Sequence, residues 1–128
     1  MSVKYLGVVA LAMLAALPQN AQAGDAATGE KTFKMKCFVC HDAAAGKNKT
    51  GPSLFGVVGR TAGTAEGFKL YRGLKGADWT WDDAALDAYL TDPIAYTKSK
   101  TGKSPGMVLK VPKAQERADI IAYLKTLK

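Results

Sequence analysis

The sequence predicts a small all-α protein in which three main helices are joined by long loops. Apolar residues recur at helical spacing in three separate segments, and no convincing run alternates apolar and polar residues as a half-exposed strand would. Glycines and prolines mark the stretches between these segments as loops. No internal repeat or low-complexity tract divides the chain, so we expect a single domain.

The N-terminal segment has the pattern of a secretory signal peptide. A positive charge precedes an apolar run of thirteen residues (5–17), and a small-x-small cleavage pattern ends at Ala23. The alternative is an uncleaved membrane anchor, but a helix that crosses the hydrocarbon core needs about twenty apolar residues. We therefore expect residues 1–23 to be removed on export to the periplasm, leaving one domain at 24–128.

The first predicted helix leads into a pair of cysteines. It begins at about Asp25 or Ala26 and runs to Phe38. Asp25 and Thr28 are the candidates for its N-cap, and Phe33 lies on its inner face.

The middle helix is the clearest of the three. Thr80, followed three residues later by Asp83, predicts its start, and Pro93 ends it near Asp92. Glycines and a Gly-Pro turn mark the preceding stretch, residues 46–68, as loop.

The last predicted helix runs from about Lys113 to Leu127, after Pro112. Its inner face is expected to carry Ile120, Ile121, Leu124 and Leu127. Between the middle and last helices, residues 96–110 are polar and rich in lysine, with a Pro-Gly pair that predicts a loop.

The chain is basic, with a formal net charge of +7. Acidic surfaces are therefore its expected partners. Nucleic acid is an unfavoured alternative, because the chain carries an export signal and its basic residues are lysines spread along the sequence rather than arginines gathered in one segment.

Cys37-Phe38-Val39-Cys40-His41 is a C-x-x-C-H motif, the attachment signature of haem c. It uses both cysteines and the single histidine of the chain. On a helical turn, offsets of 0, 3 and 4 residues fall within about 100 degrees of one face. Two thiols that form thioethers with haem vinyl groups and an imidazole that binds iron would thus face one macrocycle.

Two other uses of these residues are disfavoured. A zinc site needs four ligands, and the chain has three residues of the Cys and His types. A thioredoxin-like dithiol is expected beside a strand-helix-strand pattern, which the sequence lacks.

The opposite side of the iron needs a second donor or stays open, and this difference separates an electron carrier from an enzyme. Met35 lies two residues before Cys37, too close to reach the opposite haem face. Met107 follows a Pro-Gly turn that can direct its side chain inward, although a methionine that fills a gap in the core is the alternative.

The chain resembles a class I cytochrome c of the bacterial c-two type, related to mitochondrial cytochrome c, over nearly all of residues 24–128. The matching segments are Gly29 and Phe33, the C-x-x-C-H motif, Lys49-Thr50-Gly51-Pro52-Ser53-Leu54, Gly59-Arg60, Trp81, Tyr89-Leu90-Thr91-Asp92-Pro93, Met107 and Ile120-Ile121-Ala122-Tyr123-Leu124-Lys125. The resemblance implies a class I cytochrome c fold wrapped around one covalently bound haem.

The resemblance also assigns site residues. It implies that Met107 is the axial ligand opposite His41 and that the Pro52 carbonyl faces the free imidazole nitrogen. Arg60 and Trp81 would approach a buried haem propionate.

Further family positions are matched less closely or have a structural role. Tyr89 matches a tyrosine near the methionine sulfur, and Tyr71 is an approximate match to a propionate tyrosine. Gly29 and Phe33 would meet Ile120 and Tyr123 where the terminal helices cross.

The function that the resemblance implies is one-electron transfer without catalysis. The expected partners are acidic redox proteins: a cytochrome bc complex or dehydrogenase as donor, and a terminal oxidase or photosynthetic reaction centre as acceptor. The carrier would be a monomer with only peripheral contact to membrane proteins. Lysines that flank the two ligand-bearing segments would steer these partners. They are Lys34, Lys36, Lys47, Lys49, Lys98, Lys100, Lys103 and Lys110.

Two alternatives stay open at this point. A peroxidase-like haem enzyme or a gas sensor would have an open axial position, with Met107 as a packing residue. A fixed subunit of a larger redox enzyme would share the chemistry of a carrier but remain bound to its partner.

Overall fold

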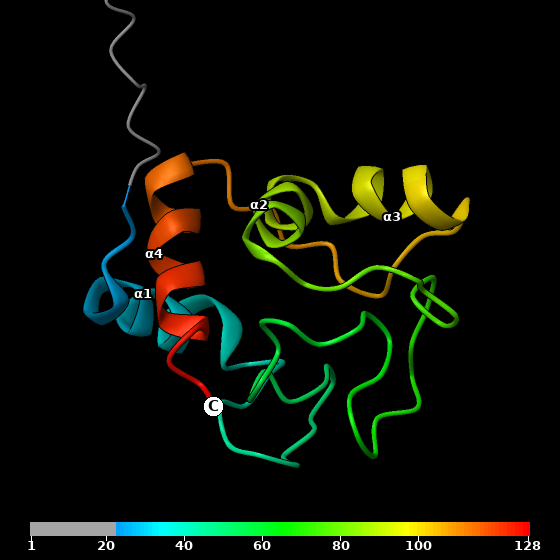
Figure 1. Cartoon of the computed structure of the whole chain (residues 1–128), viewed down its shortest axis with the longest axis horizontal. Helices are drawn as coiled ribbons and strands as arrows, with labels where there is room; N and C mark the ends of the chain where they lie inside the picture. The colour runs from blue at the N-terminus through cyan, green and yellow to red at the C-terminus, as the bar shows by residue number, and fades with distance from the viewer. Residues whose placement is uncertain (1–22) are drawn as a thin grey trace, which may run out of the picture.

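The computed structural model describes residues 23–128, and the predicted signal peptide lies outside the described residues apart from Ala23. Within this range the elements are α1 (Ala26–Thr32), the π-helical turn η1 (Phe33–Cys37), α2 (Asp83–Thr91), α3 (Pro93–Thr101) and α4 (Ala114–Leu124). The only strand-like pairing there is one isolated bridge between Thr61 and Thr80. The predicted all-α class is confirmed (Figure 1).

The first helix begins where its cap predicts and changes character before its end. The Asp25 carboxylate accepts the backbone N–H of Thr28 at 2.7 Å, which lowers the pKa of Asp25 and caps α1. After Thr32 the chain widens into η1, in which Phe38 N–H donates to the Phe33 carbonyl at 2.9 Å. The predicted helix to about Phe38 is therefore found, but its last part is π-helical, because an extra residue is inserted into the turn.

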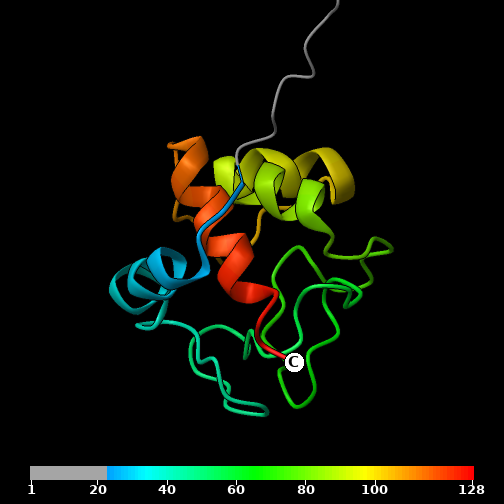
Figure 2. The same ribbon diagram turned by 60° about the vertical axis from the view of Figure 1, so that its left-hand side comes forward.

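The terminal helices cross at Gly29, as the resemblance implies. A Cβ atom at Gly29 would overlap the Asp119 carbonyl and lie 3.0 Å from the backbone nitrogen of Ile120. The Phe33 and Tyr123 rings pack beside the crossing with centroids 5.3 Å apart. Figure 2 shows α1, in blue, packed beside α4, in orange and red.

The C-terminal helix ends three residues before the predicted position at Leu127. After Leu124 the backbone closes into single turns, with Leu127 N–H donating to the Leu124 carbonyl at 3.1 Å. These turns allow the Leu127 carbonyl to accept the N–H of Gly56 at 2.7 Å. The end of the chain thereby holds the loop that follows the cysteine motif.

The middle helix starts later than its predicted capping pair. Asp82, and not Thr80, caps α2, and its carboxylate accepts the Ala85 N–H at 2.8 Å. Thr80 is instead engaged in the bridge to Thr61. The predicted end of the helix at Asp92 is confirmed.

The segment before Met107 contains a helix, α3, that the polar composition did not predict. Asp92 caps it by accepting the Ala95 N–H at 3.0 Å, Pro93 occupies its first turn, and Gly102 ends it with a φ of +71°. Its buried residues, Pro93 and Thr97, are too few to produce an apolar stripe. Capping and packing against α2 therefore determine this helix.

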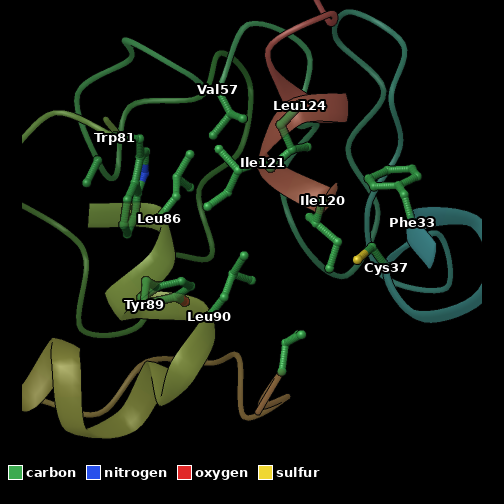
Figure 3. Close-up of a cluster of buried hydrophobic side chains, with 12 residues drawn as sticks. Phe33, Cys37, Val57, Trp81, Leu86, Tyr89, Leu90, Ile120, Ile121 and Leu124 are labelled. Atoms are coloured by element: carbon green, nitrogen blue, oxygen red, sulfur yellow. The ribbon is translucent and has the colours of Figure 1, made fainter. Parts of the chain in front are cut away.

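The core lies between α4, α2 and the loop that follows the cysteine motif (Figure 3). Phe33, Val111 and Ile120 are at most 1% exposed. Cys37 belongs to the same cluster as Trp81 and Tyr89 from the α2 region. Among the helices at residues 23–128, none is long and apolar enough to cross a membrane.

We predict that Gly29→Ala destabilises the protein by about 3 kcal/mol, because the methyl group would overlap the backbone of α4 and force the helices apart. Denaturant unfolding of the purified protein measures this change. The control is Lys31→Ala, on an exposed side chain of the same helix, which should change the unfolding free energy by less than about 0.5 kcal/mol. Equal effects of the two substitutions would contradict the close crossing.

Candidate functional site

The cysteine motif begins at Cys37, the last residue of η1, and continues through the turn that follows it. Cys40 N–H and His41 N–H both donate to the Cys37 carbonyl, at 3.0 and 2.9 Å. Cys37 is buried and Cys40 is half-buried, and neither forms a disulfide. Figure 3 shows the Cys37 sulfur on the side of Ile120. The three side chains of the motif therefore sit on a single turn, as their spacing predicts.

The His41 ring is oriented by the loop at residues 51–52. Its Nδ1 lies 2.7 Å from the Pro52 carbonyl oxygen, and since a carbonyl only accepts, Nδ1 carries the proton. Burial lowers the pKa of His41, which keeps the imidazole neutral. Nε2 is then left as the nitrogen that can bind a metal ion.

Gly51 allows the loop to approach this ring. A Cβ atom at position 51 would lie 2.7 Å from Nδ1 and 2.9 Å from Nε2 of His41. The Gly51 N–H donates to the Cys40 carbonyl at 2.7 Å, so the loop is tied to the motif itself. The sequence marks Gly51 only as a turn residue, and its contact with His41 is a finding of the structure.

Lys49 provides a second tie between this loop and the motif. Its Nζ donates to the Phe38 carbonyl at 2.7 Å and lies 3.3 Å from the centroid of the Phe38 ring. It also lies 3.7 Å from the Asp42 carboxylate.

Arg60, Trp81 and Tyr89 form a connected series. The Arg60 guanidinium donates to the Ser53 carbonyl at 3.1 Å, and the Arg60 carbonyl accepts the Trp81 N–H at 2.9 Å. The Trp81 and Tyr89 rings pack edge to face with centroids 4.9 Å apart. Burial lowers the pKa of Arg60 and raises that of Tyr89 to about 12. A chain of contacts through Arg60 and Trp81 thus links the loop that orients His41 to Tyr89 on the inner face of α2.

Two more aromatic rings extend this series. Tyr96 of α3 packs against Tyr89 at 6.0 Å and against Trp79 at 5.7 Å. The sequence did not predict a role for Tyr96, because its segment was expected to be loop.

Met107 and Tyr71 lie in loops outside that series. Met107 is partly buried and packs against the same hydrophobic cluster as Trp81 and Tyr89. The Tyr71 hydroxyl accepts the Ala65 N–H at 2.8 Å, and its ring packs against Phe68 at 4.9 Å. The structure therefore packs Met107 against the hydrophobic cluster and places Tyr71 in a local loop contact.

The eight flanking lysines are all exposed, but half of them form ion pairs. Lys34, Lys36, Lys49 and Lys110 pair with Glu30, Glu116, Asp42 and Asp92. In the described range, Lys47, Lys98, Lys100 and Lys103 form no ion pair. These four carry the uncompensated positive charge of the predicted surface.

Two observations bear on the other uses of the motif, zinc binding and dithiol exchange. From residue 23 onward, no group of three or more His, Cys, Asp or Glu side chains could hold a metal ion by itself. Burial raises the pKa of the Cys37 thiol to about 11, whereas redox-active cysteines have a lowered pKa. Burial of Cys37 is thus unfavourable for the thiolate that dithiol exchange needs.

Comparison with known proteins gives the same family for sequence and fold. The family model for cytochrome c matches residues 26–128. The chain belongs to the cytochrome c family.

Individual relatives define the type of this cytochrome c. Cytochrome c2 of Pararhodospirillum photometricum is 46% identical, with 83% of this chain and 100% of the relative covered. Cytochrome c-550 of Novispirillum itersonii is 44% identical, with coverages of 82% and 100%.

Solved structures agree with these relatives. Cytochrome c2 from Rhodospirillum centenum aligns with a TM-score of 0.72 and 39% identity, covering 81% of this chain and 98% of that one. Cytochrome cH from Methylobacterium extorquens gives a TM-score of 0.67 at 42% identity, with coverages of 80% and 99%. This cytochrome c is therefore of the class I c2 type, an electron-transfer protein and not an enzyme.

The family implies a covalently bound haem c, and the residues present fit this group. Two unpaired thiols and a neutral imidazole with a free Nε2 stand on one turn. Gly51 leaves space for the ring in the orientation that the Pro52 bond imposes.

We predict that Gly51→Ala lowers the unfolding free energy of the haem-containing protein by about 2 kcal/mol, because the methyl group would displace the imidazole. If His41 binds the iron of the haem, the reduction potential should rise, since a weaker bond to Pro52 would make the histidine a less basic ligand. Denaturation and redox titration measure the two effects. Thr50→Ala, on an exposed neighbour, should leave both unchanged.

Proposed function

We propose that residues 24–128 form a soluble periplasmic carrier of single electrons after a signal peptide is removed behind Ala23. Haem c would be attached through Cys37 and Cys40, with His41 and Met107 as axial ligands. The observation that carries this proposal is the bond between His41 Nδ1 and the Pro52 carbonyl, which leaves Nε2 free on the turn that bears both thiols.

When bound, haem c supplies an iron that changes between the ferric and ferrous states. The Pro52 carbonyl fixes the imidazole of His41. The Arg60 guanidinium and the Trp81 indole are the groups that would receive a haem propionate, because a buried carboxylate stays ionised only beside charge or hydrogen-bond donors. Tyr71 is a further candidate for this role.

Met107 decides between a carrier and an open iron site. Its partial burial against the Trp81 and Tyr89 cluster supports a position at the haem. The Tyr89 hydroxyl is protonated at neutral pH, and burial raises its pKa further to about 12, so this hydroxyl could donate a hydrogen bond to a thioether sulfur.

The partners we propose are acidic redox proteins such as a cytochrome bc complex, a dehydrogenase, a terminal oxidase or a photosynthetic reaction centre. The four lysines without ion pairs, Lys47, Lys98, Lys100 and Lys103, would supply the attraction. Charge of one sign raises the association rate with an oppositely charged partner, and salt reduces this effect.

The proposed role of Met107 as an iron ligand can be tested by spectroscopy. The purified protein should show the weak near-infrared sulfur-to-iron band in the ferric state and should not bind carbon monoxide in the ferrous state. Met107→Ala should abolish the band and allow carbon monoxide to bind. Met35→Ala is the matched control, because its side chain is 74% exposed and it should behave as the unmodified protein. Carbon monoxide binding by the unmodified protein would favour a peroxidase-like enzyme or a gas sensor instead.

Steering by the four lysines without ion pairs can be tested with small charged oxidants. The double variant Lys47→Glu, Lys103→Glu should be oxidised about tenfold more slowly by anionic hexacyanoferrate(III) at low salt and faster by cationic tris(phenanthroline)cobalt(III). Lys31→Glu, Lys113→Glu makes the same charge change on exposed lysines outside this surface. Stopped-flow rates at several salt concentrations compare the two, and equal rates would contradict steering by this surface.

A further inference from the structure

The loop that precedes α2 touches the loop that carries Met107, backbone against backbone. Gly73 has a φ of +74°, and a Cβ atom built on it would lie 2.6 Å from the carbonyl oxygen of Ser104 and 2.8 Å from its carbonyl carbon. Glycine is required here for two separate reasons. The backbone of residue 73 is left-handed, and the atoms that a Cβ would meet belong to the backbone of Ser104, which cannot rotate away as a side chain can. Ser104 lies three residues before Met107.

Both sides of this contact are held firmly. On the far side of Gly73, the Leu74 carbonyl lies against Gly63 and accepts the Ala77 N–H at 3.1 Å. On the methionine side, Pro105 is buried and Thr97 of α3 is 0% exposed. Thr97 Cγ2 would lie 3.1 Å from a Cβ atom at position 73. Gly73 is therefore enclosed between α3, Ser104 and its own loop.

Arg72 extends the contact to the residue that immediately precedes the methionine. A Cβ atom at Gly106 would lie 3.8 Å from Cδ and 3.9 Å from Cβ of Arg72. The aliphatic part of the Arg72 side chain thus lies over the backbone at Gly106, in ordinary van der Waals contact.

Apart from the exposed ion pair between Lys110 and Asp92, the loop that carries Met107 (the methionine loop, residues 103–110) has little other polar support. Over the described chain, the N–H groups of residues 104–110 donate no backbone hydrogen bond, and the next such bond runs from Val111 to the Leu90 carbonyl at 2.8 Å. Packing rather than a hydrogen-bond ladder therefore determines where Met107 lies. Of the three glycines in or against this loop, Gly73, Gly102 and Gly106, only Gly73 makes a close contact with backbone atoms.

We infer that Gly73 is a positioning residue for Met107: it holds the methionine loop against the body of the protein and so maintains the axial thioether. This inference rests on the proposed role of Met107 as an iron ligand. A loop that is less firmly held presents the thioether to the iron in a smaller fraction of molecules. An added ligand then competes more successfully for the same position, in proportion to the lost fraction.

Gly73→Ala tests the inference, and Gly76→Ala is its matched control. Gly76 stands in the same loop with a φ of +79°, but a Cβ atom there meets nothing within 4 Å. Both substitutions impose the same backbone strain, and only the first displaces Ser104. We expect the ferric Gly73→Ala protein to bind imidazole about tenfold more tightly than the Gly76→Ala protein, with a weaker sulfur-to-iron band.

The outcomes distinguish this inference from the function on which it rests. If the unmodified protein lacks the sulfur-to-iron band, the assignment of Met107 fails and the inference fails with it. If the band is present and both variants bind imidazole equally, Gly73 does not position Met107 although the carrier proposal stands. Should Gly73→Ala yield no folded protein, Arg72→Ala tests the same packing of the two loops through its contact with Gly106, with exposed Lys75→Ala as control. Equal imidazole affinity of these two variants would show that packing between the loops does not position Met107, and the inference would fall.

Discussion

The backbone contact between α1 and α4 is the constraint on which the rest of the structure depends. Gly29 has no side chain, so the two terminal helices approach until backbone meets backbone. This approach directs the chain after Thr32 across the core, where η1 delivers Cys37 into the hydrophobic cluster. From the other end, α4 brings the Leu127 carbonyl to Gly56, so the same helix pair also fixes the loop that orients His41.

The features that could be predicted from the sequence are those that depend on neighbouring residues. The spacing of Cys37, Cys40 and His41 predicts a single turn, because a helix places those offsets on one face. Asp25 was among the expected caps of the first helix because a short polar side chain before a helical segment accepts a backbone N–H nearby. Such contacts span only three or four residues, so the sequence alone contains the information.

The features that could not be predicted depend on residues far apart in the chain. Thr80 has the pattern of a helix cap, but its pairing with Thr61 removes it from the helix and leaves Asp82 to cap α2. The segment of α3 is polar, and its helix follows from the cap at Asp92 and from packing. Gly51 resembles any turn glycine until the His41 ring is found against it. Long-range contacts decide the outcome at Thr80 and Gly51, whereas at α3 the caps are local and only the packing against α2 is long-range.

The two proposed iron ligands are held by different physical means, and this difference bears on how an electron carrier works. His41 is held by a hydrogen bond from Nδ1 on a turn that is bonded to its own motif. Met107 lies in a segment fixed by packing, and a thioether is a soft, weakly polar ligand that donates no hydrogen bond. Electron transfer is fast only if the site changes little between oxidation states. The methionine side therefore depends on the loops around it, whereas the histidine side is determined by its own short stretch of chain.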